Sequence, residues 1–237
     1  PHNLLPDSSV LGYSRINIAT STSTVVSPSG LQDAVLVRPT TASGITWVYL
    51  ATTFNTGAVT TISTFAKTSG KPFVAMANSN GDVIYASFNL TTGAVGTVAS
   101  GYTANIEDFG NGWYRCSVTT PTGFNERAIY AVSDTDGAIA AAANGNDGIL
   151  LWGAQLNRSD LGGMVNNPDR GDSYVPTTTA AVYAPRRGHH IYNGSAWVNE
   201  GILHESEART NLLTSSGDLS GAGWAGNMTR GAVTSGS

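Results

Sequence analysis

The sequence carries few charges: only 12% of its 237 residues are Asp, Glu, Lys or Arg, about half of the roughly 25% that is usual. Its solubility must therefore rest on hydroxyl and amide groups. The formal net charge of -4 and a pI near 5.4 provide no broad cationic field. We therefore expect no nucleic-acid partner.

Cysteine and long apolar runs are also scarce. Cys116 is the only cysteine, which excludes an intrachain disulfide and a cysteine-based metal cluster. The longest apolar runs, 138–143 and 148–154, fall far short of the roughly 20 residues that a spanning helix needs. Stability must come from packing, and we expect no membrane insertion.

The sequence lacks the common catalytic motifs G-x-S-x-G, H-E-x-x-H and G-x-x-x-x-G-K-[ST]. Glu107 and Asp108 are adjacent, so on a strand they point to opposite faces. We therefore expect no enzyme activity and name no catalytic residue.

Two groups of residues could bind metal. The loops 134–137 and 144–148 contain Asp, Asn and Gly, which suits calcium, but turn formation explains them better. The histidines His189, His190 and His204 permit a zinc site, although a solvated linker is the simpler interpretation. We expect no cofactor and no metal site.

Period-two alternation dominates the chain and predicts strands joined by turns. In the segment 83–90, Ile84, Ala86, Phe88 and Leu90 share one face, which we expect to lie in a core. The predicted strands are 45–52, 60–67, 73–77, 83–90, 104–109, 113–119, 127–133 and 148–156. These short strands and the lack of helical periodicity predict an all-β fold, an antiparallel β-sandwich of jelly-roll type with very little helix.

The beginning of the sequence returns near its end: Asn3-Leu4-Leu5 reappears as Asn211-Leu212-Leu213. Such self-similarity predicts a tandem array. We expect a sandwich over 1–187, a connector with a β-hairpin around Asn193-Gly194 over 188–207, and an incomplete start of a second similar module over 208–237. The last segment is too short to bury a core, so it would need more chain or a partner.

Three stretches together resemble a known family. They are Asn111–Val118 (NGWYRCSV), Leu151–Leu156 (LWGAQL) and Ser173–Thr178 (SYVPTT). They are similar to the GNGWYR, WGAQL and SYIPT signatures of a carbohydrate-binding-module-like β-sandwich repeat, which occurs in fibre, spike and other structural proteins of tailed bacteriophages and phage-derived particles. The opening motif of that family usually carries Trp where this chain has Tyr13. The resemblance implies a β-sandwich on a virion surface, without identifying its ligand.

Trp113 and Arg115 are candidates for ligand binding because they share one face of a predicted strand. On an open sheet face, they could stack on a sugar ring and bond its hydroxyls. The alternative is that Trp113 fills the core, as large aromatic residues usually do. For Trp152, whose strand is apolar on both sides, we favour the core interpretation.

Tyr85 and Tyr130 are the other two candidates. If one sheet has an open concave face, these residues would lie on it, because neighbours such as Phe88 and Ile129 are better suited to the core.

Three functions remain open at this point. The first is a non-catalytic fibre or spike module on the surface of an extracellular virion assembled in the bacterial cytoplasm. As a homo-oligomer among other virion subunits, it would attach to host surface polysaccharide and gain avidity from many copies. The second is a purely architectural virion protein, a spacer, decoration or attachment module of capsid, tail or baseplate. The third is part of a polysaccharide depolymerase. Such an enzyme needs two converging carboxylates, and the sequence shows no pair of this kind, so the active site would lie elsewhere.

Overall fold

The computed structural model describes residues 2–78, 83–159, 174–183, 186–192 and 197–203. The chain divides into two compact units, Pro1–His204 and Glu205–Ser237, and every described residue belongs to the first. The predicted second module, with its repeated Asn211-Leu212-Leu213, lies outside the described residues and stays a prediction.

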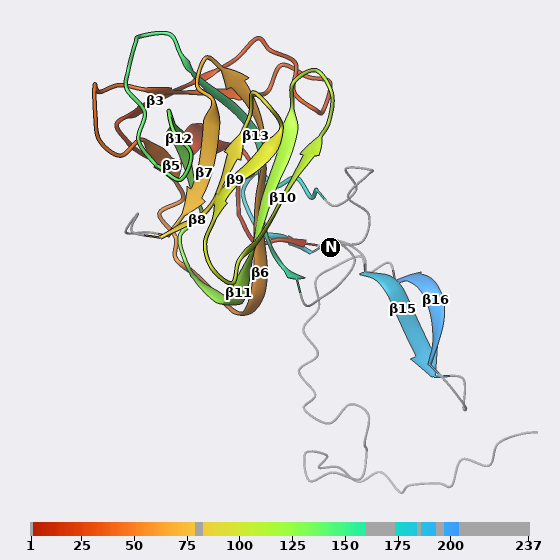
Figure 1. Cartoon of the computed structure of the whole chain (residues 1–237). Helices are drawn as coiled ribbons and strands as arrows, with labels where there is room; N and C mark the ends of the chain where they lie inside the picture. The colour runs from red at the N-terminus through yellow and green to blue at the C-terminus, as the bar shows by residue number, and fades with distance from the viewer. Residues whose placement is uncertain (1, 79–82, 160–173, 184–185, 193–196, 204–237) are drawn as a thin grey trace, which may run out of the picture. The chain divides into compact units, whose positions relative to one another are not determined.

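Two six-stranded antiparallel sheets form the body of the fold, which confirms the predicted all-β sandwich (Figure 1). The first sheet has the order β10-β11-β6-β13-β4-β3 and the second the order β2-β5-β12-β7-β8-β9. The strands of the first sheet are β3 (Ile18–Thr22), β4 (Val35–Pro39), β6 (Phe54–Ser69), β10 (Thr103–Asp108), β11 (Tyr114–Glu126) and β13 (Gly148–Arg158). Those of the second are β2 (Ser14–Ile16), β5 (Trp47–Tyr49), β7 (Phe73–Ala77), β8 (Ile84–Asn89), β9 (Ala94–Val98) and β12 (Ile129–Ser133).

Smaller elements complete the described part. The short strands β1 (His2–Asn3) and β14 (Val182–Tyr183) pair with each other, and a single 3-10 turn, η1, covers Val10–Gly12. Strands β15 (Arg186–Tyr192) and β16 (Trp197–Leu203) form an antiparallel hairpin in which Tyr192 pairs with Trp197, so the hairpin predicted around Asn193-Gly194 is present. No helix among the described residues is long and apolar enough to cross a membrane.

The chain passes between the two sheets at both lateral edges of the sandwich. At one edge β2 leads into β3 through Asn17, which has a φ of 52° and donates from Nδ2 to the carbonyl of Ile45 at 2.9 Å. At the other edge β9 leads into β10 through Gly101, with a φ of 83°. Asn and Gly tolerate positive φ better than other residues do, which explains their presence at these corners.

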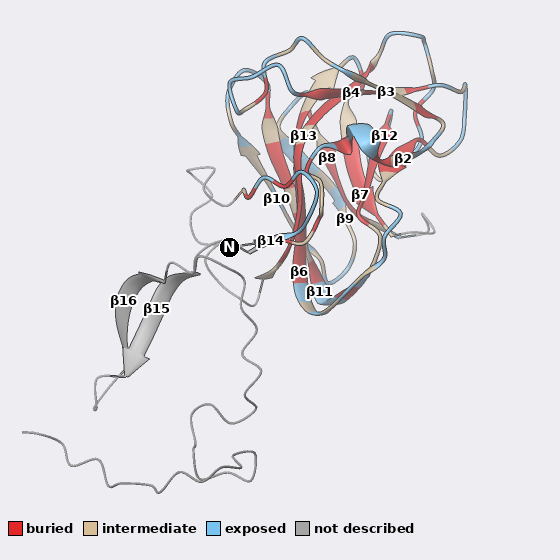
Figure 2. Cartoon of the chain, turned by 180° about the vertical axis from the view of Figure 1, so that it is seen from behind, coloured by how far each residue is buried: buried red, intermediate tan, exposed pale blue. Residues whose placement is uncertain are grey.

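Among the described residues three apolar clusters are buried, and one of these three lies between the sheets. The central cluster includes Val48, Ile62, Phe88, Tyr130 and Leu151. A second lies on the outer face of the second sheet around Trp47 and Ile129, and a third on the outer face of the first sheet around Phe65 and Trp113. Figure 2 shows buried residues along the strands and exposed residues in the connecting loops. Both sheets are therefore covered on parts of both faces.

In strand β8 the predicted core face is wrong at Ile84. Ala86, Phe88 and Leu90 lie in the central cluster as predicted, but Ile84 packs against the second cluster and Tyr85 takes a place in the central one. The pairing of β8 is irregular with both neighbouring strands. Such irregularities shift side chains from one face to the other, which simple alternation does not anticipate.

Candidate functional site

The four predicted ligand-binding residues, Tyr85, Trp113, Arg115 and Tyr130, are all buried, with exposed fractions of 8% or less. The prediction that they line an open sheet face is wrong. Its premise fails because a loop covers Trp113, Arg115 is buried beside Glu107, and the two tyrosines point inward.

Trp113 lies in the third cluster, beneath the loop that joins β3 to β4. Its indole Nε1 donates to the carbonyl of Val26 at 3.0 Å, and Ala34 and Val25 of the same loop pack on that cluster. The core interpretation of Trp113 therefore holds, since the loop seals the ring from solvent.

Arg115 lies opposite Glu107 in the β10–β11 pair, with 4.0 Å between Nη1 and Oε2. Desolvation lowers the pKa of Arg115, and the nearby Glu107 carboxylate opposes that shift. Arg115 is thus a buried member of the sheet rather than a side chain presented to a ligand.

Tyr85 and Tyr130 point into the sandwich. The Tyr130 hydroxyl donates across the core to the carbonyl of Ser63 on the opposite sheet at 3.2 Å, and Tyr85 stacks on Tyr102 with ring centroids 4.8 Å apart. Burial raises the pKa of Tyr130 far above its ordinary value. Tyr130 can be fully buried because its hydroxyl has a partner.

The aspartates of the loop 134–137 bind neighbouring segments through hydrogen bonds and an ion pair. Asp134 accepts from Lys71 Nζ and from the amide of Ala142, both at 2.7 Å. Asp136 accepts from the Ser87 hydroxyl and from the amide of Thr97. Within the described residues no group of three His, Cys, Asp or Glu side chains is placed to hold a metal ion.

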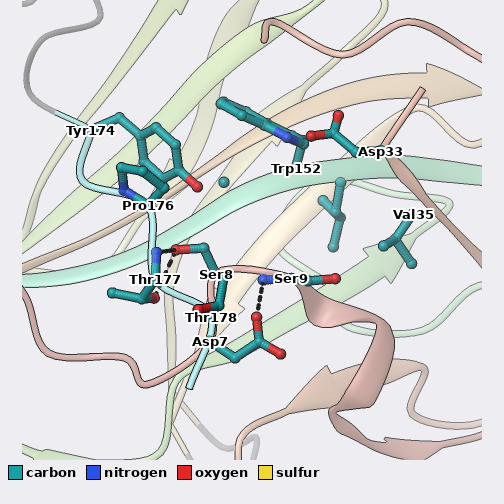
Figure 3. Close-up of a pocket in the computed structure, with 12 residues that line it drawn as sticks. Asp7, Ser8, Ser9, Asp33, Val35, Trp152, Tyr174, Pro176, Thr177 and Thr178 are labelled. Carbon is teal, nitrogen blue, oxygen red and sulfur yellow. Dashed lines mark hydrogen bonds between the residues drawn. The ribbon is translucent and has the colours of Figure 1, made fainter. Parts of the chain in front are cut away.

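A pocket of about 240 Å³ lies on the outside of the first sheet. Its apolar lining consists of Val35, Leu151, Trp152, Gly153, Tyr174 and Pro176. Its polar lining consists of Asp7, Ser8, Ser9, Asp33, Thr177 and Thr178. Figure 3 shows Tyr174 and Pro176 on one side, Asp33 and Val35 on the other, and Trp152 between them. Segments far apart in the sequence thus line one pocket.

A bulge in β13 directly follows Trp152, which shares the outer face with Leu150. Ile149 and Leu151 face the central core, whereas after the irregularity between Trp152 and Gln155 it is Ala154 and Leu156 that do so. The extra residue, Gly153, has a φ of 66°. A glycine with positive φ is the usual way to insert one residue in a strand.

Gly153 also makes room for the ring of Tyr174. A Cβ at position 153 would lie 3.1 Å from Phe65 and 3.2 Å from Tyr174. With only hydrogen there, Tyr174 lies beside Trp152 with ring centroids 4.7 Å apart. Both rings pack edge-on against Phe65, at 5.2 Å and 5.9 Å. Phe65 thus contacts both rings and restricts their positions.

Buried hydrogen bonds hold the polar side of the pocket in place. The hydroxyls of Ser8 and Thr177 are 2.9 Å apart, and the Thr177 amide donates to Ser8 Oγ at 3.0 Å. Asn3 donates from Nδ2 to Ser8 Oγ and to the carbonyls of Ala154 and Val175, at 3.0 to 3.2 Å. The pocket is therefore preformed where the first and last segments of the sandwich meet.

The Tyr174 hydroxyl lies in an acidic environment. Its pKa is raised, first by desolvation and further by the carboxylates of Asp33 and Asp7, while a hydrogen bond with Ser8 opposes the shift. Asp33 is exposed and Asp7 half-buried. The carboxylates can accept hydrogen bonds, and the neutral phenol can donate or accept them.

A lining of this kind can contact both the apolar faces and the hydroxyl groups of a polyol. Aromatic and aliphatic groups offer an apolar surface, while carboxylates and hydroxyls offer hydrogen-bond partners. Sequence reasoning missed this site, although its motifs WGAQL and SYVPTT lie here, because Trp152 stands in a strand that is apolar on both faces. Asp7 and Asp33 stand in turns, where nothing in the sequence distinguishes a binding carboxylate from a capping one.

No protein-family model matches this chain, and no curated protein matches it either.

Proposed function

We propose that this chain is a non-catalytic module of a virion surface protein, a fibre or spike of a tailed bacteriophage or phage-derived particle. In this proposal it attaches to host cell-surface glycans, with the pocket of Trp152 and Tyr174 as the binding site. The observation that carries the proposal is the half-buried pair Trp152 and Tyr174, 4.7 Å apart, beside the carboxylates of Asp7 and Asp33.

Several features support binding rather than catalysis. The lining hydroxyls of Ser8 and Thr177 are fixed by buried hydrogen bonds, so the polar groups are preorganised, which reduces the entropic cost of binding. The resemblance to the phage repeat adds that two of its three signature stretches contribute lining residues. A pocket this small gives weak binding per site, so attachment would depend on many copies on one particle.

The architectural alternative has one observation in its favour. Trp152 and Tyr174 both pack on Phe65, so the same rings could serve as a rigid contact for a neighbouring virion subunit. No observation on the described residues favours the depolymerase alternative, in which the active site would lie elsewhere.

A glycan array tests the proposal. The full chain, biotinylated and tetramerised on streptavidin, would be applied to bacterial surface polysaccharides alongside Trp152→Ala and the control Tyr49→Ala. Tyr49 is likewise half-buried but lies on β5, in the other sheet. We expect Trp152→Ala to weaken binding at least tenfold, about 1.4 kcal/mol, and Tyr49→Ala to leave it unchanged. Absence of binding by the wild-type tetramer, or equal binding by all three proteins, would reject the adhesive role of this pocket.

A further inference from the structure

The charge of the pocket limits which sugars it can accept. The lining includes two acidic side chains, Asp7 and Asp33, and no basic one among the described residues. An acidic sugar would place a third carboxylate beside these two without a cation to compensate. Like charges repel one another even where water screens them in part, whereas the hydroxyls of a neutral sugar can donate to the same oxygens.

Both acidic side chains line the pocket that also contains Trp152 and Tyr174. Asp33 and Asp7 both act on the Tyr174 hydroxyl, which stands beside the aromatic pair. In Figure 3 the side chains of Tyr174 and Asp33 approach the space beside Trp152 from opposite sides. A sugar ring stacked on Trp152 would therefore have a carboxylate within reach of its hydroxyls.

The size of the pocket limits how much of a polysaccharide can enter. Its volume of about 240 Å³ equals that of about eight water molecules at roughly 30 Å³ each, room for one sugar ring but not for two. The apolar groups Trp152 and Pro176 can cover the C–H face of that ring while the acidic groups meet its hydroxyls.

We propose that the pocket binds a single non-acidic sugar unit, at a chain end or side branch of the polysaccharide, and excludes uronic and sialic acid units. This inference rests on the proposed function, because it specifies the ligand of the same site.

Ligand-detected NMR with the full chain tests this specificity. The probes are the methyl glycosides of glucose, galactose, mannose and N-acetylglucosamine, the methyl uronides of glucose and galactose, and N-acetylneuraminic acid. Each would be tested with wild type, Trp152→Ala, Asp33→Asn, Asp7→Asn and the control Asp108→Asn. Asp108 is an exposed aspartate on β10 that accepts a hydrogen bond from the amide of Gly110, away from the pocket lining.

We expect at least one neutral glycoside to bind wild type and to lose binding in Trp152→Ala. Its matched uronide should bind at least tenfold more weakly. Asp33→Asn or Asp7→Asn should reduce the ratio of the uronide Kd to the neutral-glycoside Kd severalfold, as should added salt. Asp108→Asn should not change this ratio. Thermal unfolding of each variant checks that it is folded.

Two other outcomes would overturn the inference in distinguishable ways. If a uronide or sialic acid binds as tightly as its neutral counterpart and loses binding in Trp152→Ala, the specificity is wrong while the glycan site stands. If no probe binds, or if binding is insensitive to Trp152→Ala, the proposed function fails and the specificity fails with it.

Discussion

At the scale of single residues, Gly153 determines where the aromatic rings of the pocket lie. Its positive φ allows the bulge that directly follows Trp152, and its missing side chain leaves room for Tyr174. A side chain at this position would disturb both the backbone and the ring. Gly145 provides a comparison, because its φ is 89° but no atom lies within 4 Å of where its Cβ would be.

We predict that Gly145→Ala lowers the free energy of unfolding by about 1 kcal/mol, the cost of an L-residue with positive φ. Gly153→Ala should lower it by about 2–4 kcal/mol, because the collision with Phe65 and Tyr174 adds to that cost. Urea unfolding of both variants measures the difference. Equal losses would show that the ring of Tyr174 does not depend on the space at Gly153.

Because both faces of each sheet are partly buried, the sequence predicted the burial of some residues but not the face on which they lie. Trp113 was placed correctly by its core interpretation, because a large ring is buried on either face of a covered sheet. The faces of Tyr130 and Ile129 were exchanged: Tyr130 lies in the central cluster and Ile129 in the outer one. When both faces of a strand are apolar, alternation cannot say which one is central.

At the scale of elements, strong alternation predicted strands well, and the weaker strands were missed. The predicted strand 73–77 coincides with β7, and the other seven predicted strands overlap β5, β6, β8, β10, β11, β12 and β13. Strands β2, β3, β4 and β9 were not predicted. They are three to five residues long and mix small or polar residues with apolar ones, so their formation depends on sheet partners rather than on local pattern.

The N-terminal strand β1 depends on one buried amide. Besides donating from Nδ2, Asn3 accepts at Oδ1 from the amides of Leu5 at 3.0 Å and Leu156 at 3.1 Å. The side chain thus joins β1 to β13 and to the segment that follows Tyr174. The conformation of Asn211, in the repeated triplet, lies outside the described residues.

We predict that Asn3→Ala lowers the free energy of unfolding by about 3 kcal/mol, because it leaves several buried backbone groups without their partner. Asn146→Ala, at an exposed loop position, should change it by less than about 0.5 kcal/mol. Guanidinium unfolding of the full chain measures both values. A loss below 1 kcal/mol for Asn3→Ala would mean that water replaces the amide at this joint.

At the scale of the whole molecule, the pocket lies where the segments that begin and end the sandwich meet. Ser8 donates from its amide to the carbonyl of Thr177 at 3.0 Å, and its carbonyl accepts from the amide of Ala154 at 3.0 Å. The segments that begin and end the unit therefore meet against β13. Because these same segments line the pocket, ligand binding would also stabilise their packing against β13.

The central claim is that a sugar contacts Trp152 in this pocket, and fluorine NMR of the chain labelled with 5-fluorotryptophan tests it most directly. The chain has five tryptophans, and Trp152→Phe identifies the resonance of Trp152. During titration with the neutral methyl glycoside that binds most tightly, the resonance of Trp152 should shift and saturate. That of Trp47, on the outer face of the other sheet, should stay in place. Saturable binding of the sugar with no change at Trp152 would contradict the account.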